Sequence, residues 1–166
     1  MKQKWIGVVI ICMCFLVGCE LANTPTAQVE DLLSKYQMLD DDITVSYVDL
    51  IPDGTIQEEF QDDYEDLIKK QYRDLAYEVK EEEIDGNQAT VTVEIEVSDY
   101  GEVLRQYDVS TYGSDAEYHQ DVLKALKEVK DKVVYTIDFE VAMNDNDEWK
   151  VQPLDAEMKE KLLGIN

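Results

Sequence analysis

Residues 89–97 read ATVTVEIEV, and apolar and polar side chains alternate in it without interruption. A period of two predicts a β-strand with one face on a hydrophobic core and the other face in water. The apolar positions are Ala89, Val91, Val93, Ile95 and Val97, and the polar ones are Thr90, Thr92, Glu94 and Glu96. The rest of the chain can be placed around this strand.

Further strands are expected on both sides of it. Asp85-Gly86 tolerates the positive φ angles of a tight turn, so it predicts a hairpin with residues 77–84. Residues 133–143 alternate again, the polar cluster 144–147 predicts a second turn, and residues 149–151 return on the inner face. These patterns predict two antiparallel hairpins, about four strands in all.

The remaining segments follow helical spacing. Apolar stripes predict helices over 24–39 and 56–75, the second half of the insert 98–131, and a short terminal helix over 155–163. Helices that precede antiparallel strands predict an α+β domain with helices packed on one face of a curved sheet.

This order of elements is similar to nuclear-transport-factor-like (cystatin-like) domains, in which helices pack on a cone-shaped sheet. The resemblance covers residues 27–152, up to the Glu148-Trp149-Lys150-Val151 strand. It implies a single domain over 27–166. The insert 98–131 and the C-terminal helix depart from the simplest pattern, so the cone is either open or plugged by the insert.

Enzymes with this fold place acid–base groups inside the cone, whereas here the expected inner face is apolar. General acid–base catalysis at neutral pH needs a group tuned to that range. A register slip of one residue would instead turn Glu94 and Glu96 inward. His119, the single histidine, is interpreted as a solvated residue near a helix start rather than a base or metal ligand. We therefore expect a protein that is not an enzyme and holds no cofactor.

The N-terminus has the pattern of an export signal. Lys2 and Lys4 begin it, and the apolar run 5–17 that follows is shorter than the roughly 20 residues that span a bilayer. The run ends in Leu16-Val17-Gly18-Cys19, which resembles the lipobox of bacterial lipoproteins.

That resemblance implies a signal peptide over 1–18, cleavage between Gly18 and Cys19, and a diacylglycerol group on the Cys19 thiol. Residues 19–26 would then be a lipidated tether. We expect the domain at the extracytoplasmic face of a cell membrane, as in small lipoproteins of Gram-positive bacteria.

The net charge and the cysteine content limit the kinds of partner and of thiol chemistry that we expect for this protein. Cys12 and Cys14 lie in the apolar run and Cys19 would carry the lipid, so the mature domain has no free thiol. Removal of Lys2 and Lys4 would make the net charge of −23 still more negative. Such acidity excludes a nucleic-acid partner, because phosphate binding needs a basic surface.

Acidic clusters at 40–42, 58–63 and 144–147 could supply oxygen ligands for calcium. The last one lacks the Gly and Glu that an EF-hand loop needs at its sixth and twelfth positions, and it suits a simple turn. We interpret the other two as solvated faces. No metal site is assigned, and calcium binding by the clusters stays open.

Tyrosine is the commonest aromatic residue. Four tyrosines in the insert, where periodicity is weak, combine an apolar ring with a polar tip that suits contacts to peptides, glycans or proteins: Tyr100, Tyr107, Tyr112 and Tyr118. The alternative is that they plug the open end of the sheet. Tyrosines on helix or strand faces are interpreted as core residues: Tyr36, Tyr64, Tyr72 and Tyr135.

Together these patterns predict a lipid-anchored, non-enzymatic binding or protein-interaction module whose partner is an envelope protein or a small ligand. Two alternatives stay open. One is a small-molecule hydrolase or isomerase that uses the cone, and the other is a calcium-dependent envelope or adhesion protein.

Overall fold

The computed structural model describes residues 23–51 and 56–166 of the chain, so the expected signal peptide, Gly18 and Cys19 lie outside the described residues. The helices are α1 (Pro25–Met38), α2 (Glu58–Arg73), α3 (Tyr100–Arg105), α4 (Asp115–Glu128) and α5 (Ala156–Leu163), with 3₁₀ turns η1 (Tyr47–Asp49) and η2 (Val109–Thr111). The strands are β1 (Ala76–Asp85), β2 (Gln88–Ser98), β3 (Lys132–Met143) and β4 (Trp149–Val151).

The strands form one antiparallel sheet in the order β1-β2-β3-β4. Val93 of β2 lies opposite Ile137 of β3, and both side chains are buried. Glu94 lies opposite Thr136 on the other face, and Glu96 is exposed there. The predicted facing of β2 is therefore confirmed, and the one-residue slip does not occur.

A β-bulge at Lys80 interrupts the regular pairing of β1 with β2. The pairing shifts between Val79 and Glu81, which leaves Lys80 as the extra residue. Its ammonium group lies 2.6 Å from a carboxylate oxygen of Glu78 and 3.0 Å from one of Glu94. Because these glutamates are direct cross-strand neighbours, Lys80 offsets the repulsion between two like charges.

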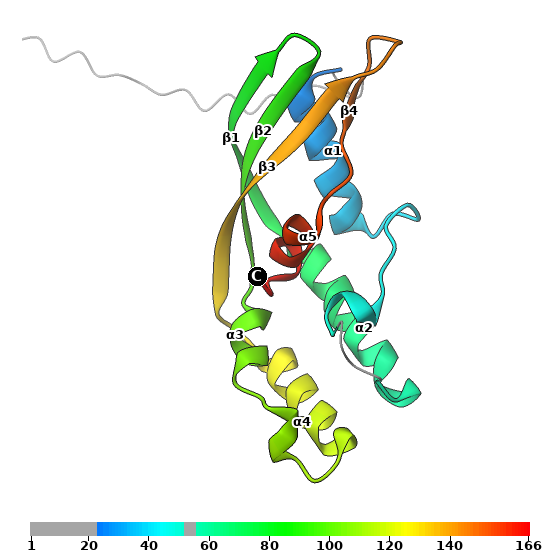
Figure 1. Ribbon diagram of the computed structural model, residues 1–166, viewed down its shortest axis with the longest axis vertical. Coiled ribbons are helices and arrows are strands. Elements are labelled where there is room, and N and C mark those ends of the chain that lie inside the picture. Colours follow the sequence, from blue (N-terminus) through cyan, green and yellow to red (C-terminus); the bar gives the residue numbers. More distant parts are fainter. Residues whose placement is uncertain (1–22, 52–55) are drawn as a thin grey trace, which may run out of the picture.

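The helices cover one face of the sheet, which confirms the α+β architecture. Figure 1 shows α1 and α5 on the inner side of the twisted sheet, α2 beside them, and the opposite face bare. Leu33 of α1, Ile68 of α2 and Leu162 of α5 are buried in one core with the apolar side chains of β2. The core is apolar because each helix directs its hydrophobic stripe toward this face.

The folded domain begins slightly before residue 27. Asn23 already forms hydrogen bonds with Asp147 and Trp149 at the end of the sheet. The Thr24 hydroxyl accepts a hydrogen bond from the Ala27 amide at 3.2 Å. This cap places Pro25 at the first position of α1, where a missing amide hydrogen costs nothing. Pro25 and Thr26 therefore belong to the helix predicted over 24–39, which is confirmed, and not to the tether expected over 19–26.

The insert consists of α3, η2 and α4, so its first half, which periodicity left unassigned, contains a short helix. Asp99 caps α3 by accepting from the Glu102 amide at 2.9 Å, and Ser114 caps α4 by accepting from the Glu117 amide at 3.3 Å. Figure 1 shows the insert at the end of the molecule opposite the two strand turns.

A buried amide joins the insert, the sheet and the C-terminus. Gln71 is 1% exposed, and its Nε2 donates to the carbonyl oxygens of Ser98 (2.8 Å) and Leu163 (2.9 Å). Its Oε1 accepts from the Ser98 amide at 3.1 Å. Gly164 ends α5 at φ +72° so close by that an added Cβ would lie 2.1 Å from the Ser98 carbonyl oxygen. One side chain of α2 therefore satisfies the backbone of two other elements.

We expect Gln71→Leu to lower the free energy of unfolding by about 3 kcal/mol or more. The substitution leaves buried backbone groups without partners, at roughly 1–3 kcal/mol each. Urea unfolding followed by circular dichroism measures the effect. Gln120→Leu, the same change at an exposed position of α4, should stay within about 0.5 kcal/mol of wild type. Equal midpoints for the two variants would contradict the role of Gln71.

Candidate functional site

The tyrosines of the insert do not form one surface. Tyr100 is fully buried, and its hydroxyl donates to the Leu67 carbonyl oxygen at 3.4 Å. Burial raises the pKa of Tyr100 to about 12. Tyr100 therefore belongs to the core and presents no side chain to a partner.

Tyr107, Tyr112 and Tyr118 are half-buried. The rings of Tyr112 and Tyr118 meet edge to face with centroids 5.5 Å apart, and Tyr118 meets His119 in the same way at 5.0 Å. Such aromatic pairs stabilise local packing. Each residue is still partly exposed to solvent, so these three tyrosines remain available at the surface of the insert.

His119 is a core residue, which corrects its interpretation as a solvated side chain. It is 5% exposed, because α4 packs on α2 and encloses the imidazole. Its Nδ1 lies 2.9 Å from the Tyr64 hydroxyl, and its ring lies beside Phe60. Burial lowers the pKa of His119, and the Asp115 carboxylate opposes that change.

A recess lies where α1, α2 and α5 meet the loop 40–51. Its volume is about 320 Å³, within the range of small-molecule sites. The lining residues come from all four segments: Tyr36, Asp42, Ile43, Thr44, Ser46, Asp49, Tyr72, Lys159 and Leu163. We call this site the tyrosine recess.

Local chain geometry builds the wall of the tyrosine recess. Leu39 ends α1 in the left-handed conformation at φ 52°, which turns the chain back. Asp40 then accepts from the Asp42 amide through its carboxylate at 3.1 Å. Ser46 caps η1 through its hydroxyl, and η1 lies against α2. This folding brings Asp49 to the two tyrosines.

Two phenols and a carboxylate dominate the recess. The Tyr36 and Tyr72 rings meet edge to face with centroids 4.8 Å apart. Burial raises the pKa of both phenols. The neighbouring Tyr36 raises the pKa of Tyr72 further, and the negative charge of Asp49 raises the pKa of both. Each phenol therefore stays protonated and neutral at physiological pH, beside a carboxylate that attracts positive charge.

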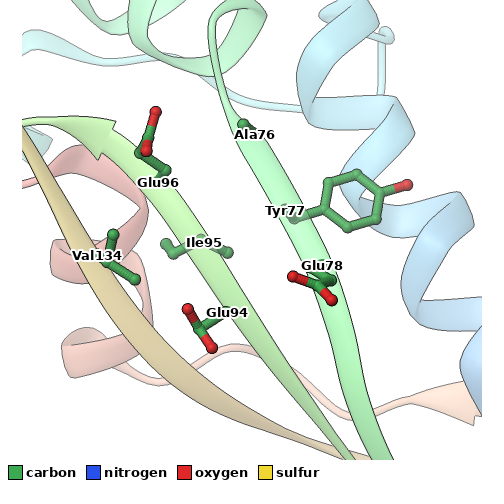
Figure 2. Close-up of a pocket in the computed structure, with 7 residues that line it drawn as sticks. All are labelled: Ala76, Tyr77, Glu78, Glu94, Ile95, Glu96 and Val134. Atoms are coloured by element: carbon green, nitrogen blue, oxygen red, sulfur yellow. The ribbon is translucent and has the colours of Figure 1, made fainter.

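A second hollow of about 230 Å³ lies on the bare face of the sheet. Figure 2 shows Glu78, Glu94 and Glu96 around it, together with the apolar Val134, while Tyr77 points toward the helix at the right of the view. Lys80 already pairs with two of these carboxylates. The hollow is smaller than the tyrosine recess, and it is formed by strands alone.

The acidic clusters do not converge on a metal site. Across residues 23–51 and 56–166, no group of three His, Cys, Asp or Glu side chains is arranged to hold a metal ion. The cluster 144–147 forms the β3–β4 turn, in which the Asn144 side chain accepts from the amides of Asn146 (2.9 Å) and Glu148 (3.0 Å). The turn interpretation is therefore confirmed.

Comparison with known proteins identifies no relative of this chain. No family model matches the chain, and no match is found among curated proteins or solved structures. In the part of the chain that the structure describes, no helix is long and apolar enough to cross a membrane.

The sequence did not indicate the tyrosine recess. The helical spacing of Tyr36 and Tyr72 predicts core residues, and Tyr72 is indeed buried. Asp49 had no visible role, because only the folding of loop 40–51 brings it to the phenols. A contact between two tyrosines on different helices cannot be predicted from their positions in the sequence.

We expect the unfolding free energy to fall as pH drops below about 6.5. The pKa of His119 is lowered by folding, so the unfolded chain binds a proton that the folded chain excludes. NMR titration of this single histidine should give a pKa below the ordinary value near 6.5. His119→Phe should lack this part of the pH dependence. A native pKa at or above 6.5 would refute the assignment.

Proposed function

We propose that the chain is a lipid-anchored, extracytoplasmic binding module that takes a small ammonium-bearing ligand in the tyrosine recess. The Leu16-Val17-Gly18-Cys19 sequence after a short apolar run supports the lipid anchor. The meeting of two neutral phenols with Asp49 in a recess of about 320 Å³ supports the binding role.

An ammonium group suits this recess for three physical reasons. Aromatic faces attract cations through their quadrupole. The Asp49 carboxylate supplies the opposite charge, and phenol oxygens accept hydrogen bonds from N–H donors. Lys159 also lines the recess, so it would pair with an anionic group at the other end of a ligand.

An enzyme in the cone has less support. The inner-face residues of β2 and β3 are apolar and packed beneath helices, and Glu94 and Glu96 lie on the bare face. A calcium-dependent role has only the overall acidity behind it. The ligand-binding role alone combines a formed recess with polar groups that converge in it.

Calorimetric titration with n-butylammonium chloride tests the recess. We expect wild-type protein to bind n-butylammonium more tightly than n-butanol, its uncharged counterpart. Asp49→Asn should weaken n-butylammonium binding about fivefold to tenfold, because one charge partner of about 1 kcal/mol is lost.

Asp41→Asn is the matched control. Asp41 is exposed on the same loop and does not line the recess, so this variant removes the same charge at a neighbouring position. Its affinity should equal that of wild type. The proposal fails if Asp41→Asn and Asp49→Asn weaken binding equally, or if n-butanol binds as tightly as n-butylammonium.

Cys19→Ala tests the anchor. In a bacterium that processes lipoproteins, we expect this variant to carry no lipid, because the thiol that would be acylated is missing. We therefore expect the variant to be lost from the membrane fraction. Its unfolding midpoint should not change, since Cys19 precedes the folded domain. Cys14→Ala should remain lipidated and membrane-bound. Mass spectrometry of the N-terminal peptide decides, and an unmodified wild-type Cys19 would remove the basis for the anchor.

A further inference from the structure

The chain joins the folded domain at one end of the sheet. Asn23 donates from its side-chain amide to the Asp147 carbonyl oxygen at 2.7 Å and accepts from the Trp149 amide at 2.9 Å. Three residues later, the amide and hydroxyl of Thr26 donate to the Glu82 carboxylate at 2.9 and 2.7 Å. These contacts fasten the start of the domain to both hairpins.

The two strand turns form a single end, which we call the sheet tip and define as residues 85–88 and 144–148. The Met143 amide donates to the Asn87 carbonyl oxygen at 2.8 Å and so joins the turns. In Figure 1 the sheet tip lies at the top with the start of α1, whereas α4 lies at the bottom.

Little chain separates Cys19 from this fastened end. Four residue steps of about 3.8 Å allow at most about 15 Å between Cys19 and Asn23. By contrast, β3 alone has 12 residues, which extend over roughly 36 Å at about 3.3 Å per residue. A lipid on Cys19 would therefore hold the sheet tip far closer to the membrane than the insert.

Charge opposes a flat arrangement on the membrane. The bare face of the sheet carries Glu78, Glu94 and Glu96, and anionic headgroups repel such a surface. The sheet tip is acidic as well, through Asp85, Asp145, Asp147 and Glu148. The short link between Cys19 and Asn23, rather than charge, therefore decides which end of the domain faces the lipid.

We propose that the N-terminal lipid holds the molecule upright, with the sheet tip facing the membrane and the insert with Tyr112 and Tyr118 pointing away from it. This proposal rests on the lipid anchor proposed above. The membrane-facing surface is a pair of turns, and the outward surface is α4 with η2.

Energy transfer to the bilayer tests the orientation. The full chain is expressed with its own signal, and the purified lipoprotein is placed in phosphatidylcholine vesicles that carry a headgroup acceptor dye. Because the mature chain would have no free thiol, a donor dye attaches only to an added cysteine: Asp145→Cys at the sheet tip or Gly113→Cys in the insert. Both positions are exposed, and a Cβ at Gly113 meets only the movable Glu117 carboxylate.

We expect several-fold higher transfer from position 145 than from position 113. A flexible 20-residue Gly-Ser segment placed between Cys19 and Asn23 should largely remove the difference. Equal transfer from the two positions of a protein whose mass shows the lipid overturns the orientation alone. A mass without lipid overturns the anchor and the orientation together.

Discussion

The fold depends on the hydrogen bonds of the buried Gln71 side chain. Its three hydrogen bonds tie α2 to the end of β2 and to the last turn of α5. The Gly101 amide donates to the Gly164 carbonyl oxygen at 2.7 Å, so the start of the insert joins the same junction. A buried amide with every donor and acceptor paired specifies one arrangement, because any shift would leave a polar group unpaired.

The sequence predicted the features that local periodicity controls. The facing of β2, the hairpins and the helices follow from side-chain spacing alone. Contacts between distant segments leave no such trace: the burial of His119 depends on α4 packing against α2, and that of Gln71 on where α5 ends. The sequence alone suggests that a polar residue beside an apolar stripe is exposed to solvent. That interpretation is wrong wherever another helix packs over the residue.

The candidate site follows the same rule. Tyr36 and Tyr72 belong to apolar stripes, so their spacing indicates only burial. Their hydroxyls become part of a recess because the αL residue Leu39 turns the chain and loop 40–51 brings Asp49 alongside. Binding sites on loops over a rigid scaffold arise in this way, since the scaffold residues are selected for packing and the loop supplies the chemistry.

The bulge at Lys80 affects how the edge of the sheet can pair with another molecule. β1 is an edge strand of ten residues, and such an edge is a template for pairing with another chain. The extra residue twists the edge, and the glutamates at 81–83 repel an identical neighbour. The edge strand thus carries two features that disfavour strand-to-strand pairing between copies of this protein.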